Sequence, residues 1–274
     1  MLDKKDEYNL ISRSASEQWI KQLKKLMDVR KAYEKSDEEY PKLNTYEIIN
    51  AGTTVNMAEC ILNVPQRELG YKFMAQEALN ILIGHNQVNA IRNFSPTITN
   101  YSDDGYFFNG HYGPMIIDQY TYIVDKLVED NNTRQAVATI WRPNPRNSKD
   151  IPCTVSVQFL IRGNRLHCVD TMRSSDIWLG WPYDIFNFTM MTAYVSCLFG
   201  LRTGDRLQLG NLFLNAGSQH LYLRDVEKAN KVLDKYLHFK VPPLQKIKIE
   251  DWTYPAEILN WLYEKAQTGD FSES

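Results

Sequence analysis

The order of apolar and polar residues predicts a helix followed by the start of a sheet. Residues 14–35 carry apolar side chains at helical spacing among lysines and glutamates, which predicts an amphipathic surface helix packed by one stripe. Ser14, three residues before a glutamate, is a candidate cap for its first turn. A polar segment with Pro41 follows, and residues 45–52 predict a strand that leads into a turn at Gly52. We therefore expect residues 1–42 to be an N-terminal helical extension and residues 43–274 to be the main domain.

The next region combines a buried helix with a long loop. Residues 71–84 place one acidic side chain, Glu77, among apolar residues and end at Gly84, which predicts a helix. The carboxylate either points to solvent or serves a function, because burying it without use is costly. Residues 93–118 are rich in Asn, Ser, Gly and Tyr, a composition typical of a loop that lines a pocket. Residues 119–130 predict a helix and residues 136–141 a strand.

Residues 151–188 form the most informative stretch. Residues 155–162 and 166–172 are rich in β-branched and large apolar side chains, and the turn-like Arg-Gly-Asn-Arg sequence lies between them. A β-hairpin is the expected structure. It brings Cys153, just before the first strand, and Arg173, just after the second, to the same end of a sheet. A cysteine and an arginine placed together there predict an active-site pocket at that end of the sheet.

The last third of the chain predicts one buried helix and several surface elements. Residues 188–199 carry almost no charge, which predicts a helix buried on most faces, with Cys197 as a packing residue. Residues 206–216 predict a strand and residues 225–239 a surface helix. The segment after two prolines, residues 246–249, predicts a short strand.

Composition excludes several classes of protein. The chain has 274 residues, 43% of them hydrophobic, which is enough for one large core. A net charge of -2 gives no electrostatic footprint for nucleic acid or for an anionic membrane. No apolar run approaches the roughly 20 residues of a membrane span, and the charged first ten residues lack a secretory signal, so a cytoplasmic location is expected. Four cysteines without Cys-x-x-Cys spacing predict reduced thiols and no metal site.

Five ordered motifs resemble the signatures of the thymidylate synthase superfamily. They are Pro152-Cys153, Gln158-Phe159, residues 173–176 (RSSD), residues 179–184 (LGWPYD) and residues 220–223 (HLYL). The Cys-Thr step followed by Val-Gln-aromatic-Leu-Ile-Arg is more similar to phage deoxycytidylate hydroxymethylases than to ordinary synthases. The resemblance implies an α/β (α+β) thymidylate synthase-like fold, a mixed β-sheet packed with helices that dimerises through the sheet, with residues 43–274 as the catalytic domain.

The resemblance also implies the reaction and its partners. The substrate would be a pyrimidine nucleoside monophosphate, dCMP in the branch named above, and the one-carbon donor 5,10-methylenetetrahydrofolate. The enzyme would be a homodimer with shared active sites, in the cytoplasm of a bacterium or of a phage-infected cell. A pyrimidine C5 becomes nucleophilic once a thiolate adds at C6, which makes Cys153 the candidate nucleophile. We expect cationic neighbours such as Arg173 or Arg134 to lower its pKa.

The remaining site residues are assigned by matching the family motifs to this sequence. Glu77 would organise water and proton transfer at the ring, and Tyr112, in a Tyr-Gly step, would pack near the nucleophile; His111 beside it is expected to be a surface histidine. The phosphate and sugar contacts implied by the resemblance come from Arg134, Arg173, Ser174, His220 and Tyr222. The folate contacts implied are Asp176, Leu179, Gly180 and Tyr183.

Asp184 carries the choice of base. Ordinary synthases have asparagine here, whose amide accepts from uracil N3–H and donates to O4, whereas cytosine presents the reverse pattern. A carboxyl group accepts from the cytosine amino group and shares a proton with N3. Asp184 therefore favours a cytosine nucleotide, although an Asp before a helix also serves as an N-cap.

The sequence departs from the family pattern in four places. No arginine occurs between Arg30 and Arg67, where synthases have a phosphate-binding loop, and only Arg134 remains where they have two adjacent arginines. Thr154 replaces a histidine, and the final residues lack the apolar residue that closes over the folate. Both changes favour a wetter site and a hydroxymethyl product. The alternatives are a CMP hydroxymethylase of a nucleoside-antibiotic pathway, a C5-methylating enzyme and an inactive nucleotide-binding homologue.

Overall fold

The fold is built on a five-stranded mixed sheet. The computed structural model describes residues 13–34, 44–236, 241 and 244–272. The strand order is β1-β5-β4-β3-β2, in which β4 and β5 are parallel and every other neighbouring pair is antiparallel. The strands are β1 (Thr45–Asn56), β2 (Val137–Thr139), β3 (Thr154–Arg162), β4 (Arg165–Asp176) and β5 (Gln208–Tyr222). The mixed sheet expected from the sequence is confirmed.

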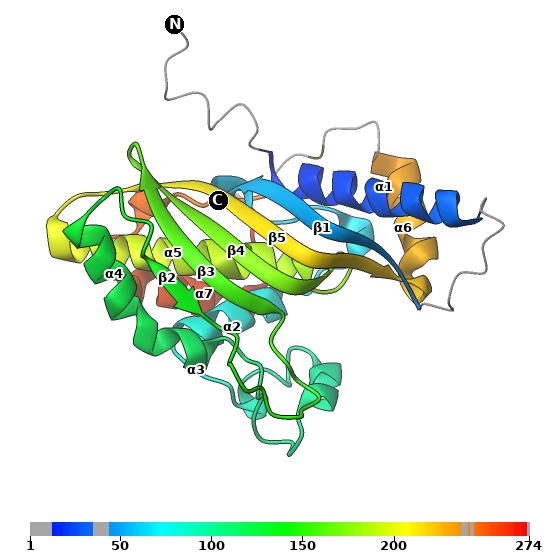
Figure 1. The fold of residues 1–274 in the computed structure, drawn as a ribbon, viewed down its shortest axis with the longest axis horizontal. Coiled ribbons are helices and arrows are strands. Elements are labelled where there is room, and N and C mark those ends of the chain that lie inside the picture. The colour runs from blue at the N-terminus through cyan, green and yellow to red at the C-terminus, as the bar shows by residue number, and fades with distance from the viewer. Residues whose placement is uncertain (1–12, 35–43, 237–240, 242–243, 273–274) are drawn as a thin grey trace, which may run out of the picture.

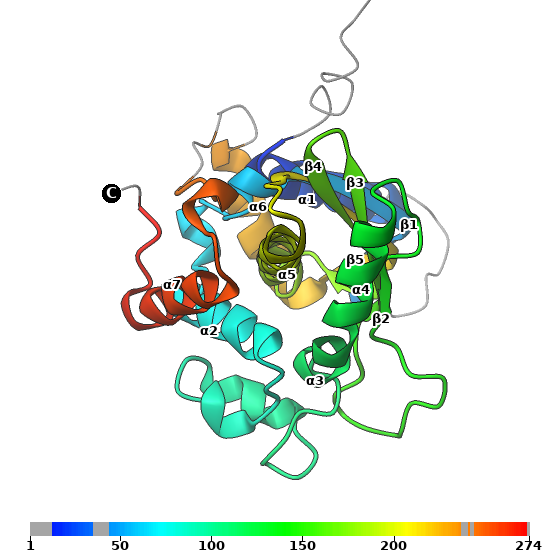
Figure 2. The same ribbon diagram turned by 90° about the vertical axis from the view of Figure 1, so that its left-hand side faces the viewer.

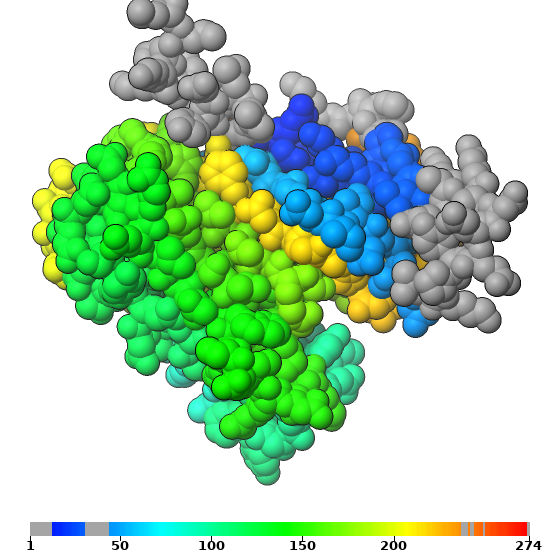
Figure 3. Space-filling view, in the orientation of Figure 1, coloured from blue at the N-terminus to red at the C-terminus, as the bar shows by residue number. Residues whose placement is uncertain are grey.

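Seven α-helices accompany the sheet within the described residues. They are α1 (Ala15–Glu34), α2 (Tyr71–Leu82), α3 (Gly113–Ile116), α4 (Tyr120–Glu129), α5 (Trp181–Thr203), α6 (Val226–Tyr236) and α7 (Pro255–Thr268). Short 3-10 helices span Met57–Glu59, Pro65–Arg67, Val88–Ala90, Pro96–Tyr101, Ile117–Gln119, Leu223–Asp225 and Ile249–Asp251. One face of the sheet looks toward the viewer in Figure 1 without a helix across it, and strand side chains form the surface there in Figure 3.

Helix α5 is the centre of the core. Figure 2 shows it end-on, with the sheet on one side and α2 and α7 on the other. Phe186, Phe188 and Met190 on this helix are fully buried. By length and composition α5 could cross a membrane, but 72% of its most apolar window is buried inside the protein. Its apolar surface is therefore accounted for by packing against the sheet and the other helices.

The hairpin of β3 and β4 forms where the sequence predicts it. Arg162 pairs with Arg165, and Gly163 between them has a φ of 60°, a conformation that glycine adopts without steric cost. The strand β4 extends beyond the predicted Met172 to Asp176, so Arg173 lies within the sheet. Its backbone N–H donates to the carbonyl oxygen of Cys153 at 2.8 Å. The two residues therefore stand side by side, as the hairpin argument requires.

Helix α1 shares the core of the sheet. Trp19, Leu23 and Leu26 are fully buried, and the indole N–H of Trp19 donates to the carbonyl oxygen of Ile177 at 2.6 Å. The backbone N–H of Glu17 donates to the Ser14 hydroxyl at 3.2 Å, which provides the expected cap. The boundary expected at residue 42 lies outside the described residues, and the two-part division of the chain stays a prediction.

Several predicted element boundaries are wrong. The first strand does not turn at Gly52 but continues to Asn56, and the buried helix begins at Trp181 rather than at residue 188 and ends at Thr203 rather than at Phe199. The strand expected at 206–216 continues to Tyr222. The strand expected at 246–249 is absent from the described residues there: Ile247 donates its backbone N–H to the carbonyl oxygen of Ala58, and a 3-10 turn follows. Each difference reflects tertiary packing that local patterns do not encode.

Candidate active site

Cys153 faces a cleft at the edge of the sheet. It immediately precedes β3 and is half-buried, and the cleft has a volume of about 210 Å³. The other lining residues are Glu77, Ile81, Ile91, Ile98, Tyr101, Phe108, Gly110, His111, Tyr112, Asp150, Ile151, Pro152, Asp184 and Asn187. The structure thus brings Cys153, Glu77, Tyr112 and Asp184 together from four separate segments of the chain.

Two loops form the outer wall of the cleft and are joined by Asp150. Its carboxylate accepts from the backbone N–H of Gly110 at 2.7 Å. A Cβ at Gly110 would come within 2.8 to 2.9 Å of Asp150 and Pro152, so this close approach requires glycine. The backbone N–H of Lys149 also donates to the Asp103 carboxylate at 2.9 Å. In Figure 1 these segments project together beyond the sheet. The loop before Cys153 is therefore fixed to the loop that carries Tyr112.

Glu77 is half-buried on α2, and its partner comes from α5. The side-chain amide of Asn187 donates to the Glu77 carboxylate at 2.8 Å. Burial raises the pKa of Glu77 from 4.5 to about 7, and the bond from Asn187 opposes part of that shift. A carboxyl group with this pKa gives up and takes back a proton easily at neutral pH. Burial is thus compatible with the functional interpretation of Glu77 rather than with a side chain that points to solvent.

Asp184 lies in the first turn of α5. Gly180 is the residue at the N-cap position, and the backbone N–H of Asp184 donates to the Gly180 carbonyl, so the alternative of Asp184 as the N-cap is wrong. Burial, and then the nearby carboxyl groups of Glu77 and Asp176, raise the pKa of Asp184 well above its ordinary value. The site therefore favours the neutral form of this acid.

The thiol of Cys153 is held in its protonated form. Burial and the carboxyl groups of Asp184 and Asp150 raise its pKa to about 11, and Arg173 opposes this only in part. The expectation of a lowered pKa is therefore wrong for the chain alone. The reason is that Arg173 is exposed and directs its guanidinium to the carbonyl oxygens of Pro152 and Ile151.

The tyrosine and the histidine that precede α3 both line the cleft. Tyr112 stacks on Phe188 with ring centres 6.0 Å apart, and burial raises the pKa of its hydroxyl well above the ordinary value. His111 is not the surface residue predicted. It is half-buried, accepts from the Gly113 N–H at 3.3 Å, and has its pKa lowered to about 4 by burial and by His85.

A second cleft adjoins the first. It has a volume of about 480 Å³ and shares Glu77, Ile98, Tyr101 and Asp184 with the Cys153 cleft. Its wall includes three of the four residues assigned to folate contacts, Leu179, Gly180 and Tyr183. The Tyr183 ring meets Phe73 edge-on at 5.1 Å, and its hydroxyl accepts from the Gly70 N–H at 3.1 Å. This wall is thus fixed by contacts with the start of α2.

Asp176 lies at the end of β4 beside this wall. Its carboxylate accepts from the backbone N–H groups of Trp178 and Leu179 at 2.8 and 3.0 Å. These bonds set the turn that presents Leu179 and Gly180. In the described structure Asp176 belongs to neither set of lining residues. In this structure Asp176 shapes the wall of the second cleft, and its contact with a folate is a proposal.

The residues assigned to phosphate and sugar lie outside both clefts of the described chain. Arg134 is exposed before β2, and its carbonyl oxygen accepts from the Gln158 side chain at 2.8 Å. Ser174 is half-buried on β4. The rings of His220 and Tyr222 on β5 meet edge-on at 5.2 Å. These residues, with Arg173, follow the sheet rather than the mouth of the Cys153 cleft.

Sequence patterns missed several polar residues of the two clefts. Asn187 and Asp150 have no motif around them, and their places depend on packing between distant segments. Arg67 lines the second cleft, donates to the Trp178 carbonyl at 2.6 Å and lies 5.4 Å from the centre of the Trp178 ring. Asp170 is fully buried on β4, where burial and Asp184 raise its pKa well above the ordinary value. An aspartate within an otherwise apolar strand is the sequence signal that could have identified Asp170.

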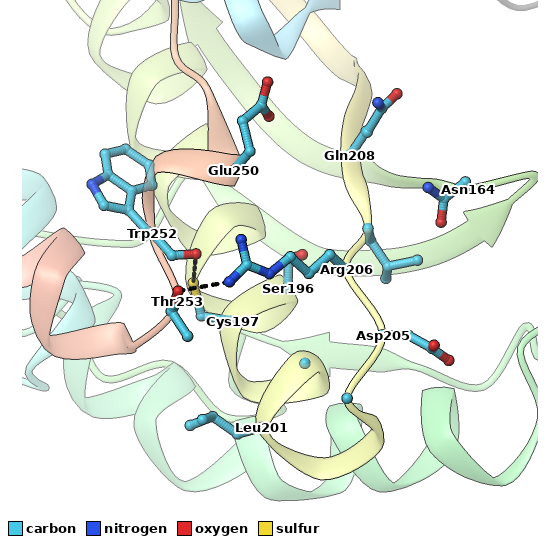
Figure 4. Close-up of a pocket in the computed structure, with 13 residues that line it drawn as sticks. Asn164, Ser196, Cys197, Leu201, Asp205, Arg206, Gln208, Glu250, Trp252 and Thr253 are labelled. Carbon is cyan, nitrogen blue, oxygen red and sulfur yellow. Dashed lines mark hydrogen bonds between the residues drawn. The ribbon is translucent and has the colours of Figure 1, made fainter.

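A separate cavity lies at the other end of α5 (Figure 4). It has a volume of about 510 Å³, and Cys197, Ser196, Arg206 and Trp252 are among its lining residues. The Arg206 guanidinium donates to the Thr253 hydroxyl at 2.9 Å. Burial raises the pKa of Cys197 to about 11. Its volume exceeds that of the Cys153 cleft, yet none of the predicted site residues lies here.

Comparisons with known proteins agree with this geometry. The family model described as thymidylate synthase matches residues 17–271. A curated relative, the deoxyuridylate hydroxymethyltransferase of Bacillus phage SP01, is 28% identical over 179 residues. The alignment covers 58% of this chain and 45% of that relative, so it spans less than half of the phage protein.

Proposed function

Since the chain belongs to the thymidylate synthase family, we propose that it transfers a hydroxymethyl group to C5 of a cytosine nucleotide, dCMP, through a covalent adduct between Cys153 and C6. The observation that carries this proposal is the position of Asp184 in the Cys153 cleft next to Glu77, in surroundings that favour its neutral form. In this proposal Asp184 recognises the base, Glu77 exchanges protons with the ring, and the Cys153 thiol attacks C6.

The neutral form of Asp184 matches the cytosine edge. A protonated carboxyl group offers one donor and one acceptor, which complement the N3 acceptor and the amino donor of cytosine. When the Cys153 thiolate adds at C6, negative charge builds on the ring, and Asp184 places its proton at N3. Uracil already carries a hydrogen on N3, so its N3 cannot accept the proton of Asp184. The geometry therefore favours cytosine at the chemical step.

Glu77 is the group that moves protons at the C4 and C5 side of the ring. Its pKa of about 7 keeps both forms populated at neutral pH. The thiol, with a pKa of about 11, must lose its proton once the substrate is bound. A partner's Arg134 at the phosphate would add to the positive charge that Arg173 already places beside Cys153. We include this shared site, in a homodimer formed through the uncovered sheet face, in the proposal.

The second cleft fits the folate that the family implies. It is a space of about 480 Å³ beside the Cys153 cleft, walled by Leu179, Gly180 and Tyr183, with apolar side chains such as Phe73 and Phe94 for a flat ring system. When bound, 5,10-methylenetetrahydrofolate would supply the one-carbon unit and leave as tetrahydrofolate, and Leu179 and Tyr183 would orient it toward C5. Once C5 has lost its proton, water would add to the methylene carbon, and the Cys153 thiolate would leave C6 to give the hydroxymethyl product. A hydroxymethyl group is also what the name of the phage relative specifies.

Two sequence features that were expected to let water into the site do not open the cleft in the structure. Thr154, which replaces a histidine, is fully buried next to Tyr112 and does not line the cleft. Phe271 near the end of the described chain is buried against Trp261 and Phe186. The preference for hydroxymethyl over methyl therefore rests on the phage relative and on the polar floor of the cleft.

A uracil nucleotide is the second candidate substrate. The phage relative is named for deoxyuridylate, which favours it. We also propose that the protein is cytoplasmic and that the chain divides at residue 42 into an N-terminal extension and a catalytic domain.

One incubation experiment distinguishes the substrates and products. The protein is mixed with 5,10-methylenetetrahydrofolate and with dCMP, CMP or dUMP, and each product is identified by mass spectrometry. A gain of about 30 Da on dCMP, the mass of CH2O, supports the proposal. A gain of about 14 Da indicates methylation. Reaction with dUMP alone, or with none of the three, contradicts the proposal.

A further inference from the structure

Asn187 is a polar residue of the cleft whose bonding is incomplete. It is 3% exposed, lines the Cys153 cleft, and uses its amide N–H to donate to Glu77 at 2.8 Å. Its side-chain oxygen is buried and has no hydrogen-bond partner in the described structure. An unpaired buried acceptor is costly, so a ligand in the cleft is the natural source of the missing donor.

When Glu77 is ionised, it sets the direction of this oxygen. An ionised carboxylate only accepts hydrogen bonds, so it holds the NH2 group of the amide against Glu77 and turns the oxygen away from it. Asn187 is also three residues after Asp184 on α5, and residues at this spacing share one face of a helix. The two side chains therefore present acceptors to the same floor of the cleft.

This floor needs a ligand with more than one donor hydrogen. Asp184, Glu77 and Asn187 together offer mainly acceptor oxygens. The exocyclic amino group of cytosine carries two hydrogens, one on the N3 side and one on the C5 side. Asp184 takes the N3-side hydrogen in the proposed function, which leaves the other without an acceptor. Uracil would place its O4 acceptor against the same oxygens.

We propose that the side-chain oxygen of Asn187 is the second acceptor for the exocyclic amino group of the cytosine base, so that Asn187 and Asp184 select the base together. This inference rests on the proposed function, because it needs a base with an amino group at C4. It assigns the asparagine two tasks: the nitrogen holds Glu77 and the oxygen reads the base.

The test separates those two tasks with two substitutions. Asn187→Leu removes both the donor and the acceptor and keeps the same number and branching of side-chain heavy atoms, and Asn187→Asp keeps an acceptor but loses the donor to Glu77. Thr192→Val on the same helix is the matched control, because Thr192 is fully buried, lines neither cleft, and donates its hydroxyl to the Phe188 carbonyl at 2.7 Å. Binding of dCMP and dUMP is measured by calorimetry without folate, and kcat/KM with folate.

The expected results differ between the variants. Asn187→Leu weakens dCMP binding at least about tenfold and leaves dUMP binding unchanged or tighter, because only with dCMP is a buried amino N–H left without its acceptor. Asn187→Asp keeps the preference for dCMP within about threefold of the wild type, while its kcat falls because Glu77 has lost its partner. Thr192→Val behaves as the wild type does. Circular dichroism checks that each variant is folded, and Asn187→Ser replaces the leucine variant if that one does not fold.

Two outcomes would overturn the inference, and they are distinguishable. If Asn187→Leu weakens dCMP and dUMP binding equally, Asn187 only positions Glu77, and the proposed function stands. If the wild-type protein itself binds and converts dUMP rather than dCMP, the proposed function fails, and the inference fails with it.

Discussion

The two ends of helix α5 carry two cavities of opposite character. At its start, Asp184 and Asn187 face Cys153 in a cleft where burial perturbs every acid, and one amide oxygen has no partner. At its end, Cys197 sits below exposed side chains such as Arg206, which is already bonded to Thr253. The second cavity is the larger, so volume alone does not favour the Cys153 cleft as the proposed site. The perturbed carboxyl groups and the unpaired amide oxygen of that cleft do favour it, because such groups cost stability unless a ligand uses them.

The largest expected effect compares the cysteines of the two cavities. Cys153→Ala removes the nucleophile and should lower kcat by at least about 10³-fold. Cys197→Ala removes a more deeply buried thiol whose pKa is similarly raised, and should leave kcat within about twofold. Steady-state assays with dCMP and thermal melts of both variants provide the measurement. Activity of Cys153→Ala within tenfold of the wild type would show that the adduct forms elsewhere.

Mixing two inactive variants sharpens the comparison, because only the Cys153 cleft is proposed to need a second subunit. Arg134→Ala and Cys153→Ala proteins should each be inactive. After subunit exchange, half of the dimers are mixed, and each has one complete site, so roughly a quarter of the wild-type activity should return. Analytical ultracentrifugation checks that dimers form. A mixture that stays inactive although the subunits exchange would contradict the shared site.

Base selection gives the next effect in size. Asp184→Asn replaces the acid with an amide that donates to O4 and accepts from N3–H of uracil. Against cytosine the same amide leaves a buried group unpaired, which costs about 1 to 3 kcal/mol, and it can no longer protonate N3. The ratio of kcat/KM for dCMP to that for dUMP should fall at least about 10²-fold. An unchanged ratio would mean that the base is read by other groups.

The sequence predicted which residues lie together in the Cys153 cleft better than it predicted their environment. Cys153, Tyr112 and Asp184 were selected because each sits in a short motif, and the hairpin register could be read from alternating apolar residues. Asn187 is bonded to Glu77, 110 positions away, and His111 is buried near His85 from an earlier segment; a local pattern contains neither relation. The pKa of Cys153 was wrong in direction for the same reason. The predicted hairpin placed Arg173 beside Cys153, but it gave no information on the carboxyl groups that surround the thiol.

The smallest effect concerns stability and distinguishes a perturbed acid from an ordinary one. The pKa of Glu77 is about 7 in the folded protein and near 4.5 in an unfolded chain. Below pH 4.5 the group is neutral in both states. As the pH rises to 7 the unfolded chain ionises first, so the folded state loses stability by an amount that stays constant above pH 7. Glu77→Gln should remove that loss.

We therefore expect Glu77→Gln to unfold in more urea than the wild type at pH 8, by about 1 to 3 kcal/mol, and by much less at pH 5. Glu227→Gln is the control, because Glu227 is 83% exposed on α6, and its removal should change stability little at either pH. A gain of equal size at pH 5 and pH 8 would attribute the effect to packing. A loss at pH 8 would mean that the bond from Asn187 outweighs burial, and that Glu77 is ionised throughout the neutral range.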